Sequence, residues 1–250
     1  MSLLKHPALD LVDFSNRLVR WHDAAYMQAG GRVFDVGIQT LGALACIKAG
    51  HPPHLSGGHS EGQNGNGSLM RVLPVALLHV PERDTDFDLV DKAMRQSLPT
   101  HAHARSQLCC AQLALWADGL RQKLNADDAW NRAAEILTRF AFGADGAPKF
   151  QCFTADLAAQ CQRFLIPDPG YLPHGSGYVL DSLWSARWAL RGRPYEAAVR
   201  AAVQLGDDSD TTAAIAGGLA GIRDGIAAIS TRWIDALKSR SVVDELLAAI

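Results

Sequence analysis

Apolar residues recur along most of this chain at alternating spacings of three and four positions. The first set is Leu11, Phe14, Leu18, Trp21 and Ala25. Because an α-helix completes a turn every 3.6 residues, this spacing places the set on one helical face. The same spacing returns within residues 109–120, 130–140, 179–190 and 195–202. No segment shows a sustained period of two with β-branched enrichment, so we expect an all-α protein in which strands are at most incidental.

Loops rich in glycine, proline and histidine separate these helical segments, at residues 50–67, 142–149 and 166–177. Long loops inside a compact helical domain are often functional, so we expect functional loops here. The chain has 250 residues and shows no internal repeat or linker. We therefore predict a compact single-domain helical bundle over residues 1–250.

Composition excludes several classes of protein. Hydrophobic residues make up 48% and the net charge is −2, which indicates a folded chain and gives no reason to expect a nucleic-acid partner. The most apolar stretch, residues 213–229, contains Arg223 and Asp224, so we expect no membrane span. Pro7 interrupts any signal-peptide apolar region. The five cysteines form no Cys-x-x-Cys pair, which is typical of reduced thiols in a cytoplasmic protein.

The sharpest candidate for chemistry is the acidic segment Gly206-Asp207-Asp208-Ser209-Asp210-Thr211-Thr212, which precedes the small-residue stretch 213–221. One interpretation is helix N-capping, which needs one such side chain or two. The other is a divalent metal site, because carboxylate and hydroxyl oxygens are the ligands that Mg²⁺ and Mn²⁺ prefer. The glycines that follow predict close packing of this helix, around a rigid site or simply in an ordinary core.

Two glycine-rich turns also precede predicted helices. Residues 64–71 read Asn-Gly-Asn-Gly-Ser-Leu-Met-Arg, and residues 175–178 read Gly-Ser-Gly-Tyr. Successive backbone amides before a helix can bind an anion, and the tyrosine could stack on a base. A flexible loop with a serine cap is the alternative for the first turn.

Two other clusters do not favour a metal site. The alternating acids Asp84, Asp86 and Asp88 lack the glycine and glutamate of a calcium loop and instead predict the capped start of a helix through Met94. His101 and His103 have no second pair at the spacing of a zinc finger.

Taken together and in this order, the motifs resemble the ADP-ribosylglycohydrolase family, in particular its dinitrogenase-reductase-activating members. The likeness runs from Leu11 to Leu237. The matching segments are Asp35-Val36-Gly37 with Thr40, residues 65–71 with Pro74, Thr100-His101, residues 175–179, and residues 206–211 with Ala216, Gly217 and Gly221. The resemblance implies an all-α fold around a dinuclear Mg²⁺ or Mn²⁺ centre. It also implies hydrolysis of the N- or O-glycosidic bond between ADP-ribose and a protein side chain, commonly arginine, or in a related ADP-ribosyl compound.

The resemblance also implies a role for each matching residue. Asp208, Asp210 and Thr211 correspond to metal ligands, and Asp208 and Asp210 are the expected catalytic carboxylates. The expected substrate-binding residues are Asp35, Gly65, Asn66, Gly67, Ser68, His101, Gly175, Ser176, Gly177 and Tyr178. The turn at residues 65–68 would hold the diphosphate, and Asp35 would lie near the scissile ribose.

The chain departs from the family pattern at its start. Family members carry a Thr-Asp-Asp-Thr motif that supplies the other metal ligands, and residues 1–4 fall shortly after it in the family register. We therefore expect a domain that is N-terminally incomplete relative to the family, with weak metal binding at one site at most and little turnover. Two hypotheses follow: a hydrolase of ADP-ribosylated substrates, or a non-catalytic descendant that binds ADP-ribose or is purely structural. The retained acidic segment favours the first.

Overall fold

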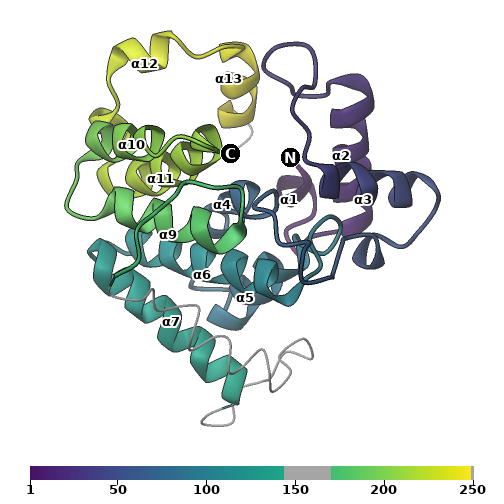
Figure 1. Ribbon diagram of the computed structural model, residues 1–250, viewed down its shortest axis with the longest axis horizontal. Coiled ribbons are helices and arrows are strands. Elements are labelled where there is room, and N and C mark those ends of the chain that lie inside the picture. Colours follow the sequence, from purple (N-terminus) through teal and green to yellow (C-terminus); the bar gives the residue numbers. More distant parts are fainter. Residues whose placement is uncertain (144–169, 249–250) are drawn as a thin grey trace.

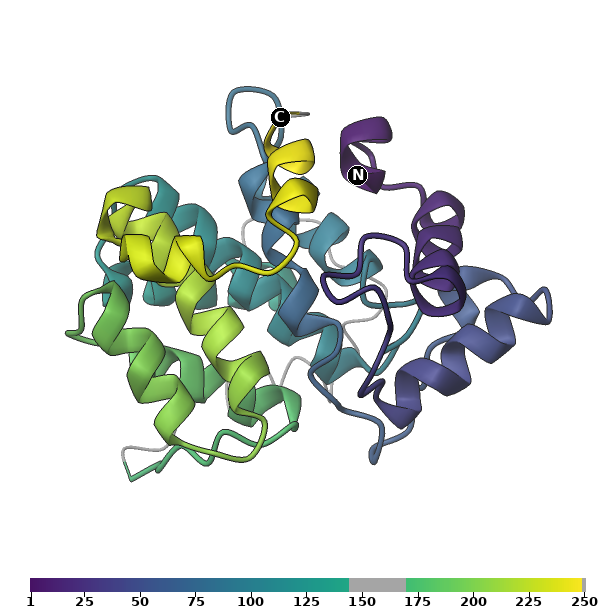
Figure 2. The same ribbon diagram turned by 90° about the horizontal axis from the view of Figure 1, so that it is seen from above.

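One buried helix, α6 (Ala104–Arg121), forms the centre of the protein. The computed structural model describes residues 1–143 and 170–248. Before α6 the chain forms α1 (Ser2–Lys5), α2 (Leu11–Ala24), α3 (Ile38–Lys48), η1 (Pro53–Leu55), η2 (Leu69–Arg71), α4 (Leu73–Leu77) and α5 (Asp86–Arg95). After it come α7 (Ala126–Phe142), α9 (Val179–Leu190), α10 (Tyr195–Gln204), α11 (Ser209–Asp224), η4 (Ile226–Ala228), α12 (Thr231–Asp235) and α13 (Arg240–Ala248). In Figures 1 and 2, α1–α3 lie on one side of α4–α6, and α9–α13 lie on the other.

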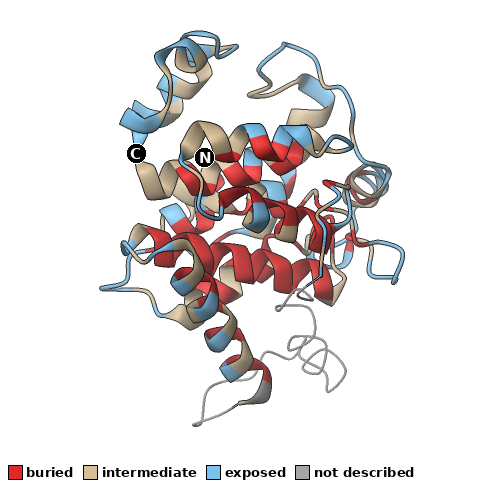
Figure 3. Cartoon of the chain, turned by 60° about the vertical axis from the view of Figure 1, so that its left-hand side comes forward, coloured by how far each residue is buried: buried red, intermediate tan, exposed pale blue. Residues whose placement is uncertain are grey.

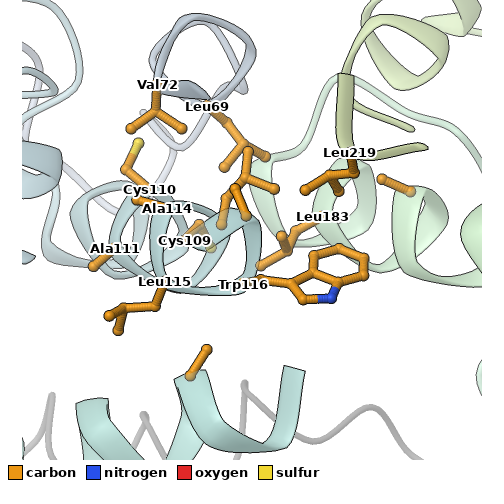
Figure 4. Close-up of a cluster of buried hydrophobic side chains, with 14 of the residues drawn as sticks. Leu69, Val72, Cys109, Cys110, Ala111, Ala114, Leu115, Trp116, Leu183 and Leu219 are labelled. Atoms are coloured by element: carbon orange, nitrogen blue, oxygen red, sulfur yellow. The ribbon is translucent and has the colours of Figure 1, made fainter. Parts of the chain in front are cut away.

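Helix α6 is buried from Arg105 to Leu120. Its apolar side chains point in all directions, as expected for a helix with neighbours on every side. It packs against α4, α5, α7, α9 and α11. Figure 3 shows the buried residues concentrated in this middle region. The residues that face one another there include Leu69, Trp116, Leu183 and Leu219, which come from four elements (Figure 4). Burial of their apolar surface is the main stabilising term of the fold.

The helices predicted from the apolar spacing are confirmed. The five apolar sets fall in α2, α6, α7, α9 and α10. Helix α5 begins where predicted, because Thr85 and Asp88 form a reciprocal capping box. Within the described residues, strand-type pairing is confined to the isolated bridges Gly58–His101 and Gly65–Tyr178. The all-α prediction is therefore confirmed. Most of the predicted loop at residues 142–149 and the start of the one at residues 166–177 lie outside the described residues.

The predicted close packing of α11 is confirmed at its glycines. A Cβ atom on Gly218 would lie 2.3 Å from Leu73 Cδ1, and one on Gly217 would lie 3.2 Å from Val199 Cγ2. Helix α11 therefore approaches both α4 and α10 more closely than a larger side chain would allow.

The layer formed by α2 and α3 is less buried than its apolar pattern suggests. Helix α2 has the predicted apolar face, but Ser15 is its only buried residue. In α3, Ala43 and Leu44 are buried while Ile38 is 90% exposed. The central apolar cluster draws its buried members from Leu69 onward, so α2 and α3 lie outside it.

Cys46, Cys109 and Cys110 form no disulfide, whereas Cys152 and Cys161 lie outside the described residues. Among residues 1–143 and 170–248, none of the helices combines the length and apolar character needed to cross a bilayer.

The close approach of α6 and α7 can be tested at Gly119. A Cβ atom there would lie 2.9 Å from Ala129 Cβ, so the two helices would have to move apart. We expect Gly119→Ala to lower the free energy of unfolding by ~1–3 kcal/mol, measured by denaturant titration. Gly42→Ala in α3 is the matched control, because a Cβ there meets no atom within 4 Å. That variant should instead gain up to ~1 kcal/mol from helix propensity. Equal effects at the two positions would contradict the packing argument.

Candidate functional site

Three segments far apart in the sequence meet at the candidate site. The first glycine turn pairs with the second, since Asn66 N donates to Gly177 O at 3.0 Å and Val179 N donates to Asn64 O at 2.9 Å. The start of α11 joins them, because Asp208 N donates to Gly175 O at 2.9 Å. The structure thus brings most of the predicted residues together: Gly65, Asn66, Gly67, Gly175, Ser176, Gly177, Tyr178 and Asp208.

The Asn66 side chain connects the first turn to the acidic segment. Its Nδ2 donates to Asp208 Oδ2 at 2.7 Å and to Ser182 Oγ at 2.8 Å, and the residue is 8% exposed. Gly177 lies beside this contact, since a Cβ atom there would be in ordinary contact with Asp208 Oδ2, at 3.4 Å. A hydrogen bond to a carboxylate is roughly twice as strong as one between neutral groups, so this link fixes the turn against the start of α11.

The acidic segment does not serve as a side-chain cap through Asp208. Asp208 stands at the N-cap position of α11 and makes no side-chain cap hydrogen bond. Asp210 is exposed in the first turn, and Thr211, 8% exposed, has its Oγ1 3.9 Å from Met70 Sδ. The capping alternative therefore fails for Asp208, whose carboxylate is held by Asn66 instead.

The residues at the start of α11 have the donor atoms that the expected metal ion prefers, but too few of them gather to complete its coordination shell. Asp208, Asp210 and Thr211 offer the oxygens that Mg²⁺ or Mn²⁺ prefers. Within residues 1–143 and 170–248, however, no three His, Cys, Asp or Glu side chains gather closely enough to hold an ion. The described side chains thus form at most part of a metal site.

Asp181 shapes the second glycine turn. Its Oδ2 accepts from Ser176 N at 2.6 Å, and its Oδ1 accepts from His174 N at 3.2 Å and from the Tyr171 hydroxyl. Burial raises the pKa of this carboxyl, but the hydrogen bonds from Tyr171 and Ser176 outweigh it and the net pKa is lowered. Sequence reasoning missed Asp181. Its signal was an acidic residue in the first turn of a helix directly after a glycine-rich segment.

His101 lies beneath the first glycine turn and is 2% exposed. A Cβ atom on Gly67 would lie 2.8 Å from His101 Cε1, whereas one on Gly65 would lie 3.5 Å from Nε2. The imidazole Nδ1 is 2.7 Å from Thr100 Oγ1. Burial first, and the charge of Arg71 second, lower the pKa of His101 to about 3. His101 is therefore a neutral ring on which the turn rests.

Arg71 ties the same turn to its surroundings from the other side. It donates from Nη1 to Gly67 O at 3.3 Å and from Nη2 to Thr100 Oγ1 at 2.8 Å. Its Nε and Nη2 also reach Gln96, at 3.1 and 2.8 Å. Burial lowers the pKa of Arg71 to about 10, so the guanidinium stays charged at neutral pH. Arg71 was not among the predicted site residues, because its role depends on partners distant in sequence.

Two predicted substrate contacts are not placed with the rest. The Ser68 hydroxyl lies inside the core, where it donates to Ser97 Oγ at 2.8 Å and has Cys110 Sγ 3.4 Å away. Asp35 is exposed with a φ of 48°, on the segment before α3. The residue that connects α3 to the turn is Gln39, whose Nε2 donates to Gln63 O at 3.0 Å and whose Oε1 accepts from Gly65 N at 3.4 Å.

Two cavities lie away from this site. One of about 170 Å³ is lined in part by residues of α1, α4 and α5, and one of about 580 Å³ is lined by residues of α7 and by Arg187. Neither cavity is lined by a predicted site residue. The candidate site therefore rests on the glycine turns and the acidic segment, and not on a cavity.

The protein is thus an all-α protein in which a glycine turn is linked to the acidic start of a helix. The chain belongs to the ADP-ribosylglycohydrolase family, whose model matches residues 1–250. An ADP-ribosylarginine hydrolase, Tri1, of Pseudomonas putida (strain GB-1) is 28% identical over 90% of this chain and 56% of its own length. The ADP-ribosyl-[dinitrogen reductase] glycohydrolase of Rhodospirillum rubrum is 27% identical over 76% of this chain and 58% of its own length.

A solved structure described as an ADP-ribosylglycohydrolase-related protein complex matches 99% of this chain and 75% of its own, with a TM-score of 0.67 and 30% identity. The matches to the two hydrolases thus span between 56% and 58% of those relatives' lengths. The predicted family and fold are confirmed.

The contact between His101 and the turn predicts different tolerances at its two glycines. Gly67→Ala would force its Cβ against the buried imidazole, so we expect a loss of ~1–3 kcal/mol in the free energy of unfolding. Gly65→Ala, with ordinary contact distances, should cost less than ~1 kcal/mol. Chemical denaturation of both variants is the measurement, and a larger loss at Gly65 would contradict the geometry.

The lowered pKa of His101 predicts a pH dependence of stability. The unfolded chain binds a proton at His101 near pH ~6.5, whereas the folded protein does so only near pH 3. The folded state therefore loses stability as pH falls from ~6.5 towards 3, by up to ~1.4 kcal/mol per unit for this group. His101→Gln should reduce the slope of unfolding free energy between pH 7 and 5. The control is His54→Gln at an exposed histidine, which should keep the wild-type slope. An unchanged slope in His101→Gln would contradict the assignment.

Proposed function

We propose that this chain hydrolyses the N- or O-glycosidic bond that links ADP-ribose to a protein side chain, arginine above all, or the same bond in a related ADP-ribosyl compound. The observation that carries the proposal is the Asn66 link, which ties the glycine turn to the carboxylate of Asp208 at 2.7 Å. A diphosphate on the turn would then present its ribose to the acidic start of α11. The relatives named as ADP-ribosylarginine hydrolase and dinitrogen reductase glycohydrolase support the substrate class.

The glycine turn suits the diphosphate because its contribution is backbone amides rather than charged side chains. Gly65, Asn66 and Gly67 precede η2. The amides of Gly65 and Asn66 already donate to Gln39 Oε1 at 3.4 Å and to Gly177 O at 3.0 Å, so the diphosphate would meet the amides of Gly67 and Ser68. Amides before a helical turn bind anions without neutralising nearby carboxylates. We propose that this turn binds the diphosphate and that the turn at residues 175–178 binds the adjoining part of the ligand.

The carboxylates suit the chemistry of glycosidic cleavage. The bond breaks through an oxocarbenium-like state, so negative charge near the anomeric carbon stabilises it. Asp210 is exposed and can accept a proton from an attacking water. Asp208 is oriented by Asn66 through Oδ2, which fixes its carboxylate next to the turn. We propose these two as the catalytic residues.

We further propose that Asp208, Asp210 and Thr211 contribute ligands to a Mg²⁺ or Mn²⁺ site. Their oxygens share the start of one helix. Because the described side chains form only part of such a site, we derive no step of the reaction through a metal ion.

A second candidate is a non-catalytic ADP-ribose-binding protein, and the incomplete metal ligand set favours it. The preserved link between the turn and Asp208 would serve binding alone in that case. In either case the partner is an ADP-ribosylated protein or a small ADP-ribosyl compound. We propose a cytoplasmic setting, because Cys46, Cys109 and Cys110 form no disulfide.

Release of ADP-ribose from ADP-ribosyl-arginine, with Mn²⁺ or Mg²⁺ present, tests the proposal. We expect Asp210→Asn to lower kcat by ~10²-fold or more, because the general base is lost. Asp207→Asn is the matched control in the same acidic segment. Asp207 is exposed with a φ of 50°, which asparagine tolerates, so this variant should keep its activity.

The same pair of variants separates the remaining alternatives. Calorimetry should show weaker Mn²⁺ binding for Asp210→Asn than for Asp207→Asn, and unchanged binding would remove the acidic segment from the metal site. ADP-ribose binding by wild type without any hydrolysis would favour the non-catalytic candidate. Equal activity in both variants would exclude Asp210 as the base.

A further inference from the structure

Tyr178 is held at both ends although the hydrolytic chemistry does not require it. Its backbone forms an antiparallel bridge with Gly65, in the first glycine turn. Its phenol oxygen accepts a hydrogen bond from Arg105 Nη1 at 3.0 Å. The residue nevertheless remains 40% exposed. The bridge thus holds the backbone of Tyr178 beside the turn and the hydrogen bond from Arg105 holds its phenol, while the residue stays partly exposed.

Arg105 is itself fixed by its surroundings. It is 7% exposed at the start of α6, and the same Nη1 donates to Glu61 Oε1 at 2.7 Å. Its backbone amide donates to His103 Nδ1 at 3.1 Å. Glu61 is also 3.3 Å from His103 Nε2 through Oε2. We call Glu61, Arg105 and Tyr178 the latch.

Within the latch, the negative charge of Glu61 balances the positive charge of Arg105, which donates to the neutral phenol of Tyr178. A buried guanidinium without an acidic partner would be unfavourable, and Glu61 supplies the negative charge from the loop before the turn. The guanidinium is planar and donates in fixed directions, so it orients the phenol more sharply than a lysine would. Burial raises the pKa of Tyr178, which keeps the phenol neutral.

The place of the ring beside the first glycine turn identifies what it would contact. A ligand with its diphosphate on that turn extends in one direction to the scissile ribose and in the other to its adenosine. An exposed aromatic ring stacks on a nucleobase without needing a particular hydrogen-bond pattern. A ring already held in position loses less conformational freedom when the base binds.

We propose that Arg105 is a positioning residue for the adenine end of ADP-ribose, acting through the phenol of Tyr178 while Glu61 balances its charge. The inference rests on the proposed function, because ADP-ribose is the ligand in both. Arg105 does not touch the ligand in this proposal. Its effect is confined to the base, and the ribose and phosphate contacts are independent of it.

Binding of ADP-ribose and of ribose 5-phosphate, which lacks the base, tests this by calorimetry or competition. We expect Arg105→Met and Tyr178→Phe each to weaken ADP-ribose binding ~3-fold to 10-fold, while ribose 5-phosphate binding stays unchanged. Tyr178→Ala should cost ~10-fold or more, because the stacking surface itself is lost. The Arg105→Met, Tyr178→Phe double variant should bind no worse than either single variant, since both break one contact. In the hydrolysis assay, KM should rise while kcat is kept.

The controls separate positioning from folding and from the proposed function. Arg200→Met removes a surface arginine paired with Glu196 and should change neither ligand's binding. If Arg105→Met does not fold, Tyr178→Phe and the exposed Glu61→Gln decide the question. Equal losses for both ligands, or additive losses in the double variant, overturn the latch. Wild-type protein that binds no ADP-ribose overturns the proposed function and the latch together, whereas normal binding in all latch variants overturns the latch alone.

Discussion

The candidate site depends on one side-chain amide. Asn66 Nδ2 reaches both Asp208 and Ser182, which belong to segments 142 and 116 residues away in the chain. The amide is almost fully buried, so removing it would leave a carboxylate and a hydroxyl without that donor, at a cost of ~1–3 kcal/mol. Thus the same interaction fixes where an anion could bind and how Asp208 is oriented. The glycines beside the contact answer to other neighbours, because a Cβ atom on Gly67 would meet His101 Cε1 at 2.8 Å and one on Gly175 would meet Leu205 Cβ at 2.8 Å.

The buried helix α6 supplies the rigidity behind this interaction. Ser106 Oγ donates to Asn64 Oδ1 at 3.2 Å, and Cys110 Sγ approaches Ser68 Oγ, so α6 holds the loop on both sides of Asn66. Ser97 adds a second anchor by donating to His101 O at 2.6 Å. Buried polar groups are costly unless all of them are paired, so such a network selects one conformation of the loop. The core therefore stabilises the fold and also positions the site.

The sequence predicts the fold and most of the site for a clear physical reason. Helical periodicity and local turn chemistry are short-range signals, so α2, α5, α6 and α9 could be placed before the structure was known. The partial burial of α2 could not be predicted, because burial depends on which elements pack against a helix, and apolar spacing does not show that. Ser68 and His101 were expected to contact a ligand, yet the Ser68 hydroxyl and the His101 ring are both buried. Asp181, Arg71 and Gln39 were missed because each acts through partners that only the folded chain brings near.

The distribution of charge around the glycine turn bears on how an anion would be held. Arg71 and Arg105 both lie near the turn, but they donate to acceptors within the protein. Arg71 donates to Gly67 O and Thr100 Oγ1, and Arg105 donates to Glu61 and Tyr178. His101 is neutral beneath the turn because burial lowers its pKa to about 3. A diphosphate bound there, as we propose, would therefore meet the backbone amides of Gly67 and Ser68 in place of a mobile cation, since those of Gly65 and Asn66 donate within the protein. This leaves the carboxylates of Asp208 and Asp210 free of a competing lysine or arginine among the contacts described for them. If the turn binds phosphate through dipoles, as we propose, no arginine or lysine of the turn forms an ion pair with Asp208 or Asp210, and both carboxylates can face the ribose.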